Sequence, residues 1–206
     1  MSNPTAGSSP VLVVYASTHG HTAKIAARLA GAMRAGGLEI ELREVGNAGD
    51  VRPERYGLVV VAASLHKHEH QHAMVDWVAA RSAALSQMPS AFLSISLSAA
   101  EDSDDARAAT QRCVDEFCAK TGWEPTRTEC IAGCLQYREY DVFTRQLMRL
   151  LMMRMGHPTD PSQDYDYTDW ETVERLGHEL AGTMTAAPVS RPARRSPSAS
   201  LAASSG

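Results

Sequence analysis

Short apolar segments recur along this chain, and a longer amphipathic segment separates each from the next. Three of them, Val11–Tyr15, Leu58–Ala63 and Ala91–Ile95, have almost no polar positions. This pattern is typical of parallel strands that are buried on both faces. Leu38–Leu42 alternates apolar and polar residues, which predicts an edge strand, and Cys130–Leu135 predicts a short fifth strand.

The amphipathic segments carry apolar residues three or four positions apart, which predicts helices. In the first helix Ile25, Leu29 and Met33 share one face, and Gly36-Gly37 ends it. Ser103 suits the start of the third helix, and Thr168 or Asp169 that of the last. The four predicted helices are Thr22–Ala35, Ala73–Leu85, Ser103–Thr121 and Asp169–Met184.

Strands and helices therefore alternate, which indicates an α/β fold with a doubly wound parallel sheet. Such sheets bind ligands beyond the carboxyl ends of their strands. Three loops are expected there: Ser17–Thr22, Ser64–His72 and Ser96–Asp102. This arrangement resembles flavodoxin-like folds, which implies five parallel strands in the order 2-1-3-4-5. We expect a leader over 1–10, one domain over 11–184 and a disordered tail over 185–206.

Composition narrows the classes of function. The chain has 206 residues and a formal net charge of -4, which argues against a general nucleic-acid-binding protein. It has neither an apolar run that could span a membrane nor a secretory signal, so we expect a cytoplasmic protein. The four cysteines form no C-x-x-C motif and are expected to be reduced thiols: Cys113, Cys118, Cys130 and Cys134.

The loop Ser17-Thr-His-Gly-His-Thr22 links the first strand to the first helix and is suited to an anion. Amide groups at a helix start lack intrahelical partners, and the helix dipole favours negative charge there. Gly20 allows close approach of a ligand, and the hydroxyl groups add donors. The loop matches neither the nucleoside triphosphate nor the dinucleotide motif. The residues fit one phosphate monoester, and a turn without a ligand is the alternative.

The same loop resembles the flavodoxin phosphate loop, although His19 stands where that pattern has Thr. Further segments resemble one family, the flavodoxin-like, menaquinone-dependent protoporphyrinogen IX dehydrogenases. The most distinctive are Met88-Pro-Ser-Ala-Phe92 and Tyr167-Thr-Asp-Trp-Glu171; the others are Ile131-Ala-Gly133 with Leu135, Tyr137, Tyr140, and Arg145 with the Met-rich run to Met155.

This resemblance implies an FMN enzyme of heme biosynthesis that oxidises protoporphyrinogen IX and passes electrons to menaquinone or ubiquinone. It also implies an insertion near the fifth strand, here about 136–164. The residues expected to bind FMN lie in the three loops and at the ends of the strands before them: Ser17, Thr18, His19, Gly20, His21, Thr22, Ala63, Ser64, Leu65, His66, Ser94, Ser96 and Leu97.

The insertion has a helical apolar stripe that includes Phe143 and Leu147, with Arg138, Arg145 and Arg149 in the same segment. A basic amphipathic helix can lie on an anionic membrane surface, where an enzyme could meet a quinone. The alternative is that the stripe packs on the domain. A Met-rich surface also suits a homo-oligomer or a porphyrin contact.

The loop from His66 to His72 has a histidine at every second position. A metal site is one interpretation, but zinc-type spacing is absent elsewhere and we predict no metal. We expect Lys67, His68 and His70 to lie near the substrate entrance, where cations attract porphyrinogen propionates. No catalytic acid or base is predicted. Two alternatives stay open: an electron carrier or quinone reductase without porphyrin activity, and a binding module without cofactor.

Overall fold

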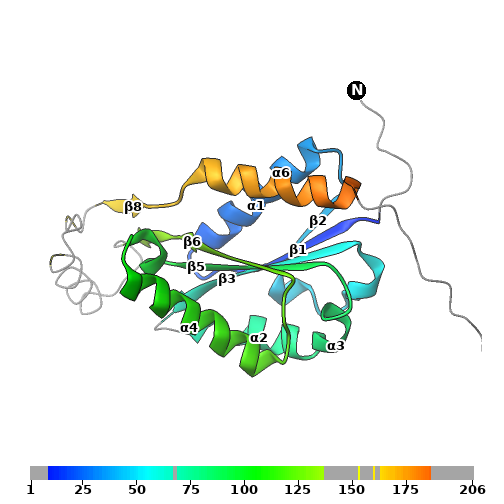
Figure 1. Ribbon diagram of the computed structural model, residues 1–206, viewed down its shortest axis with the longest axis horizontal. Helices are drawn as coiled ribbons and strands as arrows, with labels where there is room; N and C mark the ends of the chain where they lie inside the picture. The colour runs from blue at the N-terminus through cyan, green and yellow to red at the C-terminus, as the bar shows by residue number, and fades with distance from the viewer. Residues whose placement is uncertain (1–8, 67–68, 137–152, 154–159, 161–162, 187–206) are drawn as a thin grey trace, which may run out of the picture.

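The centre of the molecule is a parallel sheet between two layers of helices, as Figure 1 of the computed structural model shows. The structure describes residues 9–66, 69–136, 153, 160 and 163–186. Five parallel strands follow the order β2-β1-β3-β5-β6. Counted along the chain, this is the predicted order 2-1-3-4-5, so the predicted flavodoxin-like fold is confirmed. The strands are β1 (Val11–Ala16), β2 (Ile40–Glu44), β3 (Leu58–His66), β5 (Ser90–Ser96) and β6 (Arg127–Ala132).

Helices cover both faces of the sheet (Figure 1). On one face lie α1 (His21–Ala35) and α6 (Trp170–Ala186). On the other lie α2 (His72–Ala79), α3 (Ser82–Leu85) and α4 (Asp104–Thr121). Three short 3-10 turns complete the connections: η1 (Val45–Asn47), η2 (Pro53–Arg55) and η3 (Ser98–Ala100).

Burial on both faces explains why the central strands are apolar at every position. In β1, Val11 and Val13 pack with α1 and α6, whereas Leu12 and Val14 pack in the cluster beneath α2 and α4. Successive side chains of a strand point to opposite faces, so a strand between two helical layers has no polar face. The sheet thus has two cores, which hold the carboxyl ends of its strands in place.

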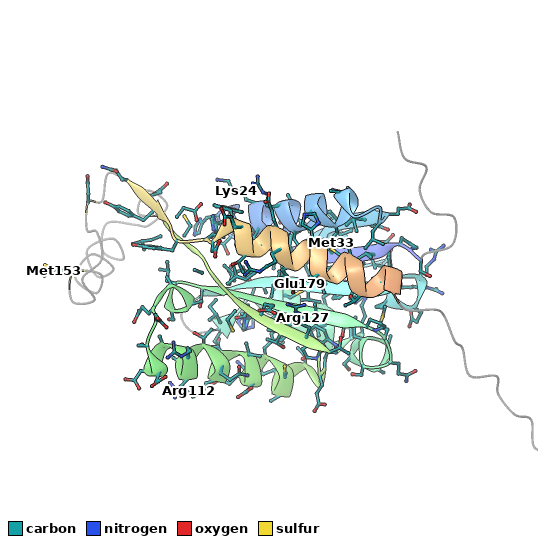
Figure 2. All side chains as sticks on the ribbon, turned by 45° about the horizontal axis from the view of Figure 1, so that its top comes forward. Lys24, Met33, Arg112, Arg127, Met153 and Glu179 are labelled. Atoms are coloured by element: carbon teal, nitrogen blue, oxygen red, sulfur yellow. The ribbon has the colours of Figure 1, made fainter. Side chains whose placement is uncertain are left out.

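The last helix docks tightly on the first. Gly177 lies so close to α1 that a Cβ atom there would be 2.7 Å from the Cβ of Ala32. Figure 2 shows Arg127 of β6 beside Glu179 of α6, and their side chains form an ion pair of 2.7 Å. These contacts fix the middle of α6 against α1 and against the first residue of β6.

Two of the predicted elements are divided in the structure. The predicted helix 73–85 consists of α2 and α3, and between them Arg81 donates hydrogen bonds to the carbonyl groups of Val51 and Gly49. The predicted strand 130–135 was wrong in extent. The sheet strand is β6, and after Gly133 the chain forms β7 (Cys134–Gln136), which pairs antiparallel with β8 (Asp164–Asp166).

The predicted loop after the third strand is also wrong. There β3 continues to His66 and pairs antiparallel with β4 (Glu69–His70), so this segment is a hairpin. The predicted edge strand 38–42 begins two residues later, at Ile40. Most of the predicted insertion, the leader up to residue 8 and the tail from residue 187 lie outside the described residues. Within the described part of the chain, no helix has the length and apolar character to cross a bilayer.

Candidate functional site

A cavity of ≈ 90 Å³ lies at the carboxyl ends of β1, β3 and β5, where the sequence predicts ligand binding. Pockets that enclose a whole ligand usually measure about 300–1,000 Å³, so this cavity has room for only part of such a ligand. All three predicted loops contribute. The lining residues are Ser17, Thr18, His19, His21, Thr22, Ser64, Leu65, Ile95, Ser96, Leu97, Gly133 and Cys134.

The loop between β1 and α1 presents the start of a 15-residue helix to this cavity. Gly20 is the N-cap and has a left-handed backbone with φ of 82°, which L-residues with a side chain adopt only at a cost. No side chain caps the helix, so its first amide groups are not bound by the cap residue. The amides and the helix dipole together favour an anion at this end.

The hydroxyl group of Ser17 is evidence that this cavity binds a ligand. Its Oγ atom is buried and has no hydrogen-bond partner among the described residues. An unpaired buried hydroxyl costs about 1–3 kcal/mol, and phosphate oxygens would be suitable acceptors. The lining has no Lys or Arg among the described residues, so amides, hydroxyls and histidines are the available donors. These residues fit a phosphate monoester, as expected from the sequence.

His21 is held at the edge of the cavity by Thr168, which the sequence analysis considered as a helix cap and as part of the segment Tyr167–Glu171 but not as a site residue. The His21 Nε2 atom lies 2.7 Å from Thr168 Oγ1, which in turn donates to the Ala132 carbonyl over 2.8 Å. Because the single hydroxyl proton of Thr168 is used there, Nε2 of His21 must donate. Burial lowers the pKa of His21. The nearby charge of Asp166 acts to raise this pKa, and the charge of Lys24 acts to lower it further. No local signal could reveal a contact 147 residues apart.

The second and third strand ends complete the cavity. Gln71, which the sequence did not indicate, donates to the Ser64 hydroxyl over 2.7 Å and to the Ala16 carbonyl over 3.3 Å. It thereby fixes the end of β3 beside the end of β1. The Ser96 hydroxyl accepts from the Ala99 amide, which shapes the turn containing Leu97. Of the predicted flavin contacts, nine line the cavity: Ser17, Thr18, His19, His21, Thr22, Ser64, Leu65, Ser96 and Leu97. Gly20, the N-cap of α1, lies between His19 and His21 in the same loop.

Other predicted site residues are placed elsewhere. Ala63 and Ser94 are fully buried within the sheet. His66 ends β3, and its side chain is not described. Lys67, His68, Arg138, Arg145 and Arg149 lie outside the described residues, so their proposed contacts stay predictions.

The predicted exposed position of His70 needs correction. Its side chain is 6% exposed, packs between Phe92 and Phe117, and hydrogen-bonds Ser94 Oγ over 3.0 Å. The β3–β4 hairpin turns this side chain into the core, where it cannot contact a substrate. His70 anchors the hairpin instead.

This buried histidine predicts a pH dependence of stability. Burial lowers the pKa of His70 to about 4, from 6.5. The unfolded chain therefore binds more protons between these values, so stability is complete above pH 6.5 and falls as the pH drops toward 4. The loss should reach about 2–3 kcal/mol in urea unfolding. A His70→Gln variant should show a flatter profile, and a profile as steep as that of the wild type would contradict this assignment.

Cys134 lines the cavity as a neutral thiol. Burial, with Asp166 and Asp164 nearby, raises its pKa to about 11. A thiolate nucleophile is thus not formed near neutral pH. Among the described residues, no three His, Cys, Asp or Glu side chains are grouped to bind a metal ion.

Comparisons with known proteins agree with this geometry. The sequence profile of the Flavodoxin domain matches residues 12–162. The chain belongs to the flavodoxin domain family. A solved flavodoxin 1 from Bacillus cereus superposes with a TM-score of 0.51 at 15% identity, over 84% of this chain and 98% of that one, and supports the fold.

Two curated relatives carry the same name, protoporphyrinogen IX dehydrogenase [quinone]. The Escherichia coli K12 protein is 30% identical over 82% of this chain and 93% of its own. The Leishmania major protein is 30% identical over 86% of this chain and 77% of its own. The flavodoxin domain is an FMN-binding domain, so the predicted cofactor and the predicted class, a flavin-dependent oxidoreductase, are confirmed.

Proposed function

We propose that this protein oxidises protoporphyrinogen IX to protoporphyrin IX, with FMN as cofactor and a membrane quinone as electron acceptor. The observation that carries this proposal is the match to relatives of that name along 93% of the Escherichia coli protein. A flavodoxin domain by itself would fit an electron carrier equally well. The length of the match, which continues beyond the shared domain, favours the dehydrogenase.

The described residues suit the binding and orientation of FMN. In this proposal the phosphate is held by the amides at the start of α1 and by the hydroxyls of Ser17 and Thr22. Ser64 and Leu65 after β3, with Ser96 and Leu97 after β5, border the rest of the cofactor. FMN supplies the electron transfer when it is bound. The chain positions the cofactor and keeps the neighbouring Cys134 thiol protonated.

The substrate is proposed to enter beside the β3–β4 hairpin, whose turn carries Lys67 and His68. The described strands β3 and β4 pair at Leu65–His70 and His66–Glu69, next to Ser64 and Leu65 of the cavity lining, and Lys67 and His68 stand between these strands in the sequence. Cations at the turn would attract the propionate groups of the porphyrinogen, as the sequence suggests.

Turnover tests the proposal directly. Purified, FMN-loaded protein should convert protoporphyrinogen IX to the fluorescent porphyrin under anaerobic conditions when a menaquinone or ubiquinone analogue is added. A reaction without quinone is the control. Lys67→Gln with His68→Gln should raise KM for porphyrinogen about tenfold while leaving FMN affinity unchanged. FMN-loaded protein that reduces quinone with NADH but never oxidises porphyrinogen would instead be a quinone reductase.

Peripheral membrane contact is proposed for the insertion, on the sequence pattern of its apolar stripe and arginines. The wild-type protein should float with vesicles that contain anionic lipid, and less so at high salt. Phe143→Asp with Leu147→Asp should abolish flotation. Equal recovery of both proteins in the unbound fraction would exclude this contact and favour packing of the stripe on the domain.

A further inference from the structure

The phosphate end of the cavity has no Lys or Arg among its described lining residues, although the proposed ligand is a dianion. Among the described residues that line it, the side chains that can carry a positive charge are the imidazoles of His19 and His21, and the raised pKa of Cys134 keeps its thiol neutral. A full counter-charge is therefore present only if a histidine becomes protonated. The geometry decides which of the two is suited to this.

His21 is the first residue of α1, so it belongs to the helix turn that faces the anion. Its side chain is 10% exposed and is fixed through Nε2 to Thr168. That bond assigns the first proton to Nε2 and leaves Nδ1 to receive a second. An incoming proton would thus add a charge without breaking the contact that holds the ring.

The groups around His21 have opposite effects on the charge of its ring. Asp166 of β8 places Oδ1 3.6 Å from Nε2, and its carboxylate favours a charged ring. Lys24, one turn further along α1, opposes it; Figure 2 shows Lys24 at the end of α1 that adjoins β8. Trp170 of α6 packs edge-on at 5.8 Å and removes water without adding charge. His19 shares the cavity lining. Burial and Lys24 thus favour the neutral ring, Asp166 favours the charged ring, and an anion bound at the start of α1 would act in the same direction as Asp166.

We propose that His21 takes up a proton when FMN binds and that the resulting cation makes the site prefer FMN over riboflavin. This inference rests only on the FMN-binding part of the proposed function. His21 acts here as a specificity-determining residue of the cofactor site, and Asp166 and Thr168 position its charge and its ring.

The direction of the effect follows from linkage. In the free protein, burial keeps the His21 pKa low, so the ring is neutral at pH 7 and above. A bound dianion favours the charged ring and raises that pKa. FMN affinity must then increase as the pH falls into the interval between the two values. Riboflavin has no phosphate, so its affinity should change little.

Titration calorimetry can measure the number of protons that the protein takes up when a flavin binds. FMN and riboflavin are titrated into the full-length, flavin-free protein at pH 7 in two buffers with different ionisation enthalpies. His21→Gln is the main variant, since its amide can still donate to Thr168, and His19→Gln is the matched control in the same loop. Asp166→Asn tests the supporting carboxylate. The ionisation of FMN itself is common to all the proteins and cancels in the comparison.

Wild-type protein and His19→Gln should take up a fraction of a proton with FMN and none with riboflavin. His21→Gln should take up none, and its FMN-to-riboflavin affinity ratio should be about tenfold lower at pH 6, the scale of one charge-assisted hydrogen bond. Asp166→Asn should reduce the uptake. In NMR spectra of the wild type, the His21 ring should shift to its protonated form on addition of FMN at pH 7, which needs no variant.

The outcomes separate this inference from the proposed function. FMN binding without proton uptake, or uptake that survives in His21→Gln and disappears in His19→Gln, would overturn the role of His21 and leave the dehydrogenase proposal intact. Protein that binds no FMN would overturn both. Uptake that depends on His21, in a protein that fails to oxidise porphyrinogen, would support this inference and reject the proposed reaction.

Discussion

Gly177→Leu is expected to cost more than about 4 kcal/mol of unfolding free energy, or to prevent folding. A Cβ atom at this position would lie 2.7 Å from the Cβ of Ala32 and 2.9 Å from the Leu29 carbonyl oxygen. The second contact is with the main chain of α1, which cannot rotate away. A larger side chain must therefore push α6 away from α1, and both helices cover the same core.

Gly182→Ala in the same helix is the matched control. A Cβ atom there meets nothing within 4 Å, so this change should stabilise α6 by about 0.5–1 kcal/mol, the usual cost of glycine in a helix. Urea unfolding followed by circular dichroism measures both variants. Similar stability for Gly177→Leu and the wild type would show that the two helices are further apart than in this structure.

The fold could be predicted because the signals for it are local. Val11–Tyr15 is apolar at every position, and in the structure β1 is buried between the two helical layers. The N-cap at Ser103 could also be predicted, and its hydroxyl accepts from the Ala106 amide. Each of these features depends on residues within one turn or one strand, so no tertiary information is needed.

The errors arise where tertiary pairing overrides local pattern. The segment Ser64–His72 was predicted as a loop, but Leu65 pairs with His70, and the hairpin buries that histidine against two phenylalanines. The sequence of β6, from Arg127 to Ala132, is too polar for a buried strand and was recognised only at its end. It lies outermost in the order of described strands, where one row of backbone groups is unpaired by the sheet.

The sequence predicted which loops form the site, but not the residues that hold the side chains of those loops in position. Ser17–Thr22 was recognised because strand, glycine turn and helix are contiguous. Thr168 and Gln71, which hold His21 and Ser64, are joined to the loop only by the fold. Thr168 stands in the segment Tyr167-Thr-Asp-Trp-Glu171 that carries the family resemblance, but no local pattern shows that it contacts His21.

Ser17→Ala is expected to change stability in opposite directions with and without FMN. In flavin-free protein the variant should be about 1 kcal/mol more stable, because it removes a buried hydroxyl that has no partner among the described residues. With FMN it should bind about 10–100-fold more weakly, since a hydrogen bond to a charged phosphate contributes about 1.5–3 kcal/mol. At saturating FMN the lost ligand stabilisation then exceeds the gain.

Ser96→Ala makes the same chemical change in the same cavity, but its hydroxyl already accepts from the Ala99 amide over 3.1 Å. That variant should be less stable than the wild type in the flavin-free state. Thermal unfolding with and without FMN, together with quenching of FMN fluorescence, measures both effects. Removal of a hydroxyl group that serves packing should lower stability both with and without FMN. Removal of a hydroxyl group that serves a ligand should raise the stability of the flavin-free protein. If Ser17→Ala behaves like Ser96→Ala without flavin and binds FMN as tightly as the wild type, Ser17 is not a phosphate ligand.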